Sequence, residues 1–278
     1  MIERYGPASE IKVLTALTLA VLTTLVTTCA VFIPASVQAI TFGKSDENNH
    51  PNVGAVLFDY DMLNPGPDNA CSGTLIRNDI QAVVLTAAHC DPAYQGLPSD
   101  RVAVSFDSNV RPVSSTTKLY YGRFIRNPRH TNPNPDPYDI AVVVFDQPIP
   151  DITPAQLPTQ GQLDQMLVAG QLPQTYTVVG YGDTELQRND GWRRSAVSGF
   201  VNLDPVFLNL DQNHLHGYGG TCGHDSGGPV FLGSSSTEEN VVVAITYSGD
   251  LLCTDTGQYY RIDTASAREF LSKYVTLP

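Results

Sequence analysis

Basic residues are scarce in this sequence, and their scarcity excludes one class of partner. The chain has 16 Lys and Arg against 28 Asp and Glu, and its formal net charge is −12. Binding to nucleic acid phosphates requires clustered Lys and Arg, whereas the basic residues here are scattered along the chain. We therefore expect no nucleic acid partner.

Sequence patterns of metal sites are also lacking. The chain has five Cys but no C-x-x-C pair. His214 and His216 lie close together, but neither has a convincing third ligand. We interpret them as loop histidines and expect neither a metal ion nor an organic cofactor.

Long amphipathic helices are missing from most of the chain. After Ala39 the sequence has short apolar or alternating runs rich in Val, Ile, Tyr and Phe, separated by Gly, Pro, Asn and Asp. This pattern is typical of antiparallel strands joined by turns and predicts a barrel or sandwich fold. A helix is expected only near the C-terminus, where the apolar residues of 264–275 fall on one face. The Pro- and Gln-rich stretch 146–162 indicates a linker between two halves.

The one long apolar run lies at the N-terminus. Residues 13–33 are apolar and Thr-rich, Pro34 ends them, and "SVQA" (36–39) offers the small residues that signal peptidase reads. We predict cleavage after Ala39, which makes 1–39 a signal peptide and the protein secreted or periplasmic. The run is longer than an ordinary signal core, so an uncleaved membrane anchor is the alternative, and membrane contact is expected only in that case.

Cleavage there would leave an even number of cysteines. The four that remain are Cys71, Cys90, Cys222 and Cys253. In an exported chain an even number indicates two disulfides, and the sequence alone allows three pairings.

Three segments together contain the side chains of a nucleophilic site. "LTAAHC" ends an apolar strand with His89, "PYDIAVVVF" places Asp139 before another strand, and "GHDSGGPV" presents Ser226. A serine hydroxyl is a weak nucleophile at neutral pH. An imidazole can take its proton, and a buried carboxylate can fix the imidazole tautomer. Each residue alone is weak evidence, but the conjunction is specific.

The chain resembles the trypsin/chymotrypsin-type serine proteases over roughly residues 40–275. The chain order His, Asp, Ser also fits this family, and it differs from the subtilisin and α/β-hydrolase orders. The segments that carry the resemblance are "CSGTLI", "LTAAHC", "YDIAVV", "CGHDSGGPV" and "GQYYRI".

The resemblance implies an all-β fold of two six-stranded antiparallel β-barrels with a C-terminal helix. The peptidase domain would span 40–278. Its parts would be a first barrel at about 40–150, a second barrel at about 160–262 and a helix at about 264–275. The disulfides implied are Cys71–Cys90 and Cys222–Cys253.

The resemblance also implies roles around the serine. The backbone amides of His224 and Ser226 would form the oxyanion hole. After signal cleavage, the new N-terminal ammonium of Ile40 would pair with Asp225 and order the site. The alternative is that Ile40 simply begins a strand and Asp225 finds another partner.

Two features depart from the family pattern or limit what it implies. The family has Gly where this chain has His224, so the oxyanion amide must come from a residue that favours the required backbone conformation less than Gly. Gly220 stands where trypsin-like members carry Asp, so a preference for basic side chains is not supported. The predicted pocket is uncharged and suits apolar or aromatic side chains, unless Asp250 or Asp255 reaches its mouth. Its predicted residues are Gly220, Thr221, Thr246, Tyr247, Ser248 and Gly257.

The sequence therefore predicts a secreted, monomeric serine endopeptidase that acts on polypeptides through His89, Asp139 and Ser226. A catalytically silent homologue that acts as a binding or regulatory module is the main alternative, because of His224. A non-proteolytic esterase that uses the same residues is a third.

Overall fold

The computed structural model describes residues 40–58, 68–131, 135–186 and 188–278, apart from the side chains of Asn69 and Gln95. All of these described residues belong to one compact unit. The predicted signal peptide, 1–39, lies outside the described residues. No helix within the described ranges is long and apolar enough to cross a membrane.

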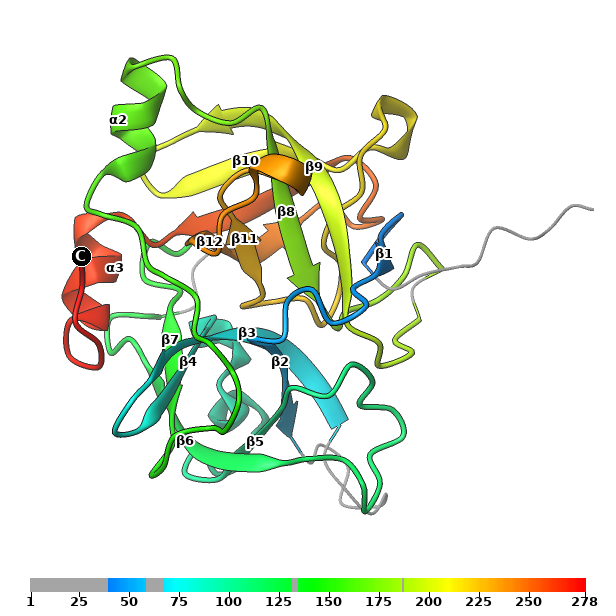
Figure 1. Ribbon diagram of the computed structural model, residues 1–278, viewed down its shortest axis with the longest axis vertical. Coiled ribbons are helices and arrows are strands. Elements are labelled where there is room, and N and C mark those ends of the chain that lie inside the picture. Colours follow the sequence, from blue (N-terminus) through cyan, green and yellow to red (C-terminus); the bar gives the residue numbers. More distant parts are fainter. Residues whose placement is uncertain (1–39, 59–67, 132–134, 187) are drawn as a thin grey trace, which may run out of the picture. The chain divides into compact units, whose positions relative to one another are not determined.

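The first half of this unit is a closed barrel of six antiparallel strands, joined in the order β2-β3-β4-β7-β6-β5. Figure 1 shows these strands gathered in one half of the molecule. Every residue of β4 is buried, as expected from the apolar sequence "AVVLT". The strands are β2 (Val53–Phe58), β3 (Asp68–Asn78), β4 (Ala82–Thr86), β5 (Val102–Ser105), β6 (Tyr120–Arg126) and β7 (Ala141–Val144).

The second half is a sheet in the order β1-β9-β10-β13-β12-β11-β8, which closes into a second six-stranded barrel because β9 also pairs with β8. The two-barrel fold expected from the sequence is thus confirmed. Lys44–Ser45, which fall in the range expected for the first barrel, pair with β9 instead. The strands are β1 (Lys44–Ser45), β8 (Thr175–Gly180), β9 (Arg194–Leu203), β10 (Phe207–Asp211), β11 (Pro229–Phe231), β12 (Val242–Gly249) and β13 (Thr256–Arg261).

Two α-helices accompany the strands in the described part of the chain. The C-terminal helix α3 (Ala265–Leu271) begins after Thr264, whose side chain accepts a hydrogen bond from the backbone N–H of Ala267. The other, α2 (Gln162–Val168), was not predicted and begins where the linker was expected to end. The Asp263 carboxylate accepts the N–H of Leu163 at 2.9 Å, so a residue distant in the sequence caps α2.

Arg193 links the two halves through a fully buried guanidinium. Its Nε donates to Asp46 Oδ2 at 2.9 Å, and its Nη1 donates to the carbonyls of Val53 (3.1 Å) and Phe106 (3.0 Å) in the first half. A buried charge is tolerated only when it is paired and hydrogen-bonded, as it is here. These contacts fix the first barrel against the start of β9.

Candidate active site

His89 and Asp139 are brought together by the pairing of two strands. His89 lies in a short 3₁₀ helix directly after β4, and Asp139 lies just before β7. Because Thr86 of β4 pairs with Ala141 of β7, these strand ends are neighbours. Asp139 Oδ2 lies 2.6 Å from His89 Nδ1, and Asp139 Oδ1 accepts the His89 backbone N–H at 2.8 Å.

This two-point contact restrains the imidazole. The Asp139 side chain is 1% exposed and that of His89 is 28% exposed, so the carboxylate is buried while the ring reaches the surface. The Tyr247 ring contacts the His89 ring edge to face, with centroids 6.2 Å apart. A carboxylate held in this way orients the ring and favours the tautomer with its proton on Nδ1.

The serine loop, defined here as residues 222–228, packs against the strand ends that carry His89. Ser226 O accepts the N–H of Ser72 at 2.9 Å and lies 3.7 Å from Cys90 Sγ. A β-carbon at Gly227, whose φ is 78°, would lie 2.5 Å from the backbone nitrogen of Ala87. Only Gly permits so close an approach in this left-handed conformation. The loop therefore lies directly beside the residues that precede and follow His89.

No hydrogen bond joins Ser226 Oγ to His89 among the described residues. In proteins without bound substrate, hydrogen bonds between catalytic groups are often long or poorly aligned. The geometry therefore brings the serine loop to the histidine without closing this contact.

Two backbone amides around His224 have no hydrogen-bond partner among the described residues. Gly223 O accepts the N–H of Asp183 at 2.7 Å, and His224 O accepts from Ser72 Oγ at 3.2 Å. In a trans peptide the carbonyl and the next N–H point in opposite directions, so the His224 N–H points away from Asp183. Within the described residues, neither the His224 N–H nor the Ser226 N–H donates a hydrogen bond. Two such amides beside a nucleophile can stabilise a developing oxyanion.

His224 adopts a left-handed backbone conformation, with φ = 68°. Its Nδ1 lies 3.1 Å from Asp183 Oδ1. This hydrogen bond with Asp183 raises the pKa of His224 above its ordinary value, against the opposing effect of burial. The imidazole thus has a partner of its own outside the His89–Asp139 pair.

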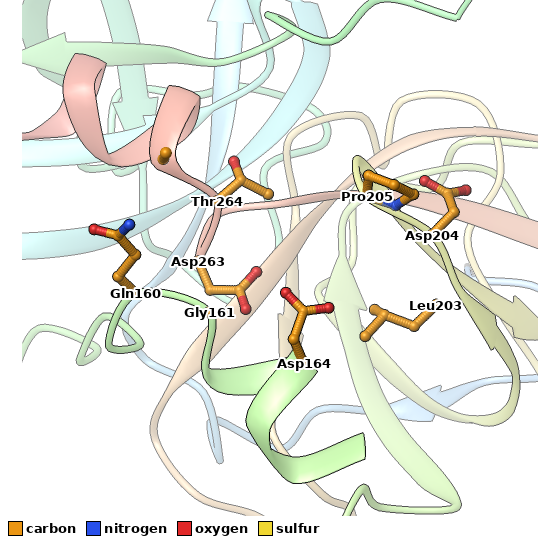
Figure 2. A pocket seen from close by; sticks show the side chains of 9 residues that line it. Gln160, Gly161, Asp164, Leu203, Asp204, Pro205, Asp263 and Thr264 are labelled. Atoms are coloured by element: carbon orange, nitrogen blue, oxygen red, sulfur yellow. The ribbon is translucent and has the colours of Figure 1, made fainter. Parts of the chain in front are cut away.

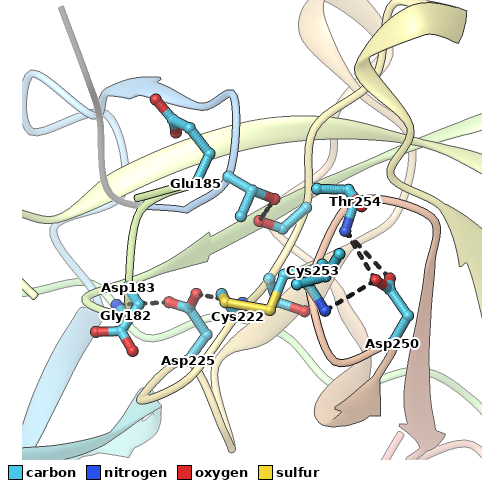
Figure 3. Close-up of a disulfide and its surroundings, with 12 residues drawn as sticks. Gly182, Asp183, Glu185, Cys222, Asp225, Asp250, Cys253 and Thr254 are labelled. Carbon is cyan, nitrogen blue, oxygen red and sulfur yellow. Dashed lines mark hydrogen bonds between the residues drawn. A yellow bond between two sulfur atoms is a disulfide. The ribbon is translucent and has the colours of Figure 1, made fainter. Parts of the chain in front are cut away.

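Asp225 is a fully buried carboxyl group beside the serine. It accepts the backbone N–H of Gly182 at 2.7 Å and of Cys222 at 2.9 Å (Figure 3). Gly182 has to be Gly, because a β-carbon there would lie 2.5 Å from Gly223 O and would also meet the carboxylate. Burial raises the pKa of Asp225 to about 7, although the two amides act in the opposite direction.

The segment after Ile40 reaches the same region. The Ile40 side chain is fully buried in the core of the second barrel. Thr41 Oγ1 donates to Gly220 O at 3.1 Å, and the Gly220 N–H donates to Thr41 O at 3.0 Å. Asp225 has no ion-pair partner among the described residues. A free ammonium at Ile40 remains a prediction.

The predicted pocket residues lie directly before the serine loop, at Gly220 and Thr221, and on the paired strands β12 and β13. Thr246 pairs with Tyr259, and Tyr259 Oη lies 3.0 Å from Thr221 Oγ1. A β-carbon at Gly220 would lie 2.7 Å from Cδ of Gln212, a fully buried residue that sequence reasoning missed. An Asp in place of Gly220 would collide with Gln212 unless that side chain moved.

Asp250 does not act as a free charge in this region. Its carboxylate accepts the backbone N–H groups of Thr254 (3.1 Å), Asp255 (2.9 Å) and Thr256 (3.0 Å) from its own loop. Burial acts to raise the pKa of Asp250, but these amides lower it overall. The carboxylate therefore stabilises the loop that carries Cys253, as Figure 3 shows.

Two disulfides tie these segments together. Cys71–Cys90 joins β3 to the residue after His89, and Cys222–Cys253 joins the serine loop to the loop between β12 and β13. This is the pairing that the family resemblance implied. The two bonds hold both parts of the candidate site close to their neighbouring strands.

Other polar clusters have structural explanations. Figure 2 shows the side chains of Asp164 and Asp204 lining a cavity with Asp263. Arg261 pairs with Asp164 and Asp263, and Asp204 accepts the N–H of Phe207 at 2.7 Å. These carboxylates are already engaged and do not form an open site.

The described ranges contain no group of three or more His, Cys, Asp or Glu arranged to hold a metal ion. His214 and His216 lie in a short 3₁₀ helix rather than an irregular loop. The His214 ring stacks on Phe42 with centroids 4.2 Å apart, and His216 Nδ1 lies 2.7 Å from Asp211 Oδ2.

Comparison with known proteins places the chain in a family. A search of curated proteins found no match. The family model described as Trypsin matches residues 43–269, which include His89, Asp139, Ser226 and both disulfides. The match covers most of the chain, and the two-barrel fold agrees with it. The chain belongs to the trypsin family of serine proteases.

Proposed function

We propose that this protein is a secreted serine endopeptidase that hydrolyses peptide bonds through an acyl-enzyme. His89 is the general base and then the general acid, Asp139 orients it, and Ser226 is the nucleophile. The observation that carries the proposal is the contact of both Asp139 oxygens with His89, beside the serine loop.

The reaction follows from these roles. Ser226 Oγ attacks the substrate carbonyl carbon while its proton passes to His89 Nε2, and the N–H groups of His224 and Ser226 receive the oxyanion. The C–N bond then breaks as His89 returns the proton to the leaving amine. Water, deprotonated by His89, attacks the acyl-enzyme and releases the acid product and Ser226.

The polypeptide substrate, the export and the cleavage after Ala39 are parts of the same proposal. The two disulfides support an oxidising compartment, because such bonds persist mainly in exported proteins. The left-handed φ of His224 supports a usable oxyanion hole. We propose an uncharged pocket around Gly220 and Gly257 that receives an apolar or aromatic side chain.

The test is covalent labelling by a serine-directed phosphonate, followed by assays with a peptide library and a simple ester. The parent protein should be labelled at Ser226, and Ser226→Ala should abolish labelling and hydrolysis while the fold stays intact. Ser272→Ala, which changes an exposed serine of the C-terminal region, is the matched control. A folded parent that is not labelled would point to a silent homologue. Hydrolysis of the ester without any peptide would point to an esterase.

A further inference from the structure

A second histidine lies behind the catalytic pair. The side chains of His130 and Asp136 are each 1% exposed, and His130 Nδ1 lies 2.6 Å from Asp136 Oδ2. The same nitrogen lies 3.8 Å from Asp139 Oδ1, the oxygen that accepts the His89 backbone N–H. The contact with Asp136 is short but not aligned as a hydrogen bond.

Asp136 holds the loop that carries these groups. Its Oδ1 accepts the N–H of Tyr138 at 2.8 Å, and its Oδ2 accepts the N–H of Thr131 at 3.2 Å. Its own N–H donates to Tyr247 Oη at 3.0 Å. Tyr247 also contacts the His89 ring, so the second barrel touches both the loop and the catalytic histidine.

The His130 ring makes its polar contacts through Nδ1. Nε2 is buried and has no hydrogen-bond partner among the described residues. The Tyr94 ring lies edge to face against the imidazole, with centroids 6.0 Å apart, and the Arg126 guanidinium covers Tyr94. The carboxylates of Asp136 and Asp139 are therefore the charged groups in contact with the ring.

A buried polar side chain with an unsatisfied nitrogen is costly, and such a group needs a compensating role. We propose that His130 is a positioning residue that, together with Asp136, holds the Asp139 carboxylate in the orientation that His89 requires. The inference rests on the proposed function, because it assigns His130 a role in the same reaction. His130 does not touch the substrate and acts only through Asp139.

Two substitutions of similar size separate this role from simple packing. In His130→Asn the amide nitrogen takes the place of Nδ1, whereas in His130→Gln it takes the place of Nε2. His130→Gln should lower kcat/KM by about tenfold to a hundredfold, mainly through kcat, because Asp139 loses its support and the His89 ring is misplaced. His130→Asn should stay within about threefold of the parent. His216→Gln, which alters an exposed histidine beside Asp211, is the matched control and should leave kcat/KM unchanged.

Proton NMR supplies a readout that does not depend on activity. The proton shared by His89 Nδ1 and Asp139 Oδ2 should give a low-field resonance in the full chain, because the two atoms are 2.6 Å apart. This resonance should shift or broaden in His130→Gln and remain in His130→Asn. A parent without peptidase activity would overturn the proposed function, but the resonance would still test the link between His130 and Asp139.

The proposal fails if His130→Gln keeps kcat/KM within twofold of the parent with an unmoved resonance. It also fails if both variants lose activity and thermal stability equally while the resonance stays in place, because that pattern indicates packing alone. If His130→Gln does not fold, Asp136→Asn replaces it. That variant keeps one acceptor oxygen for the loop amides and replaces the other with a donor, and it should shift the same resonance. An unmoved resonance would reject the proposal.

Discussion

The candidate site has two parts, the His89–Asp139 pair and the serine loop, and they differ in where their stabilising contacts come from. His89 and Asp139 stand at the ends of paired strands β4 and β7, and their contacts are short. The serine loop takes partners from elsewhere in the chain, including Ser72 of β3 and Asp183. Its buried Asp225 has two amide partners and no ion pair among the described residues. The base is thus preorganised by strand pairing, whereas the nucleophile depends on long-range contacts.

The largest loss of activity is expected from a substitution in the first barrel. Asp139→Asn should lower kcat by about 10⁴-fold, because an amide in this position favours the wrong tautomer of His89. Steady-state kinetics on a peptide substrate would measure the loss, with Asp79→Asn on the surface as the control. A loss below tenfold would mean that Asp139 does not hold the catalytic histidine.

Catalytic activity should also depend on which residue is the N-terminus of the chain. A chain starting at Ile40 should exceed a chain that retains Ala39 by about a hundredfold or more in kcat/KM, because a free ammonium can pair with Asp225 and order the oxyanion amides. Activity should fall at alkaline pH as the ammonium loses its proton. Its ordinary pKa is about 7.7–8.0, and pairing with Asp225 would raise it. Equal activity of the two chains would remove the proposed pairing.

Without that ammonium, Asp225 should make stability depend on pH. Its pKa is raised from 3.8 when unfolded to about 7 when folded, so the folded form binds more protons in this range. Parent stability should therefore fall relative to Asp225→Asn as pH rises from about 4 to about 7, by about 1.4 kcal/mol per pH unit. Urea unfolding of the chain that retains Ala39, at pH 5 and pH 7, measures the difference. A difference that stays constant with pH would contradict the expectation.

The smallest expected effect concerns His224. His224→Gly should raise kcat about tenfold, or about 1.4 kcal/mol, and change KM less, because Gly adopts the left-handed conformation of φ = 68° more readily. His224→Ala, which keeps a β-carbon and removes the imidazole, should give no such gain. If His224→Gly instead lowers kcat, the imidazole assists the reaction and is not a handicap.

Much of this architecture was predictable from local patterns. Alternating and apolar runs indicated the strands, because burial on a pleated sheet imposes that periodicity. The segments around His89, Asp139 and Ser226 pointed to the family, and the resemblance implied both disulfide pairings. A C-terminal helix was also predictable, since one face of 264–275 is apolar.

Contacts between residues far apart in the chain could not be predicted in this way. Helix α2 is capped by Asp263, Gly220 packs against Gln212, and His130 lies against Asp139. The loop that contains His130 and Asp136 has no periodicity, and its four prolines indicated only an irregular segment.

By itself the sequence indicated that the chain is built of many short strands and which side chains are available for chemistry. Only the tertiary structure decided which of those side chains meet, how deeply Asp225 is buried and which amides beside Ser226 lack a hydrogen-bond partner among the described residues. The physical reason is that periodicity reports the environment of each segment separately, whereas distances, desolvation and hydrogen-bond geometry arise when the segments pack together.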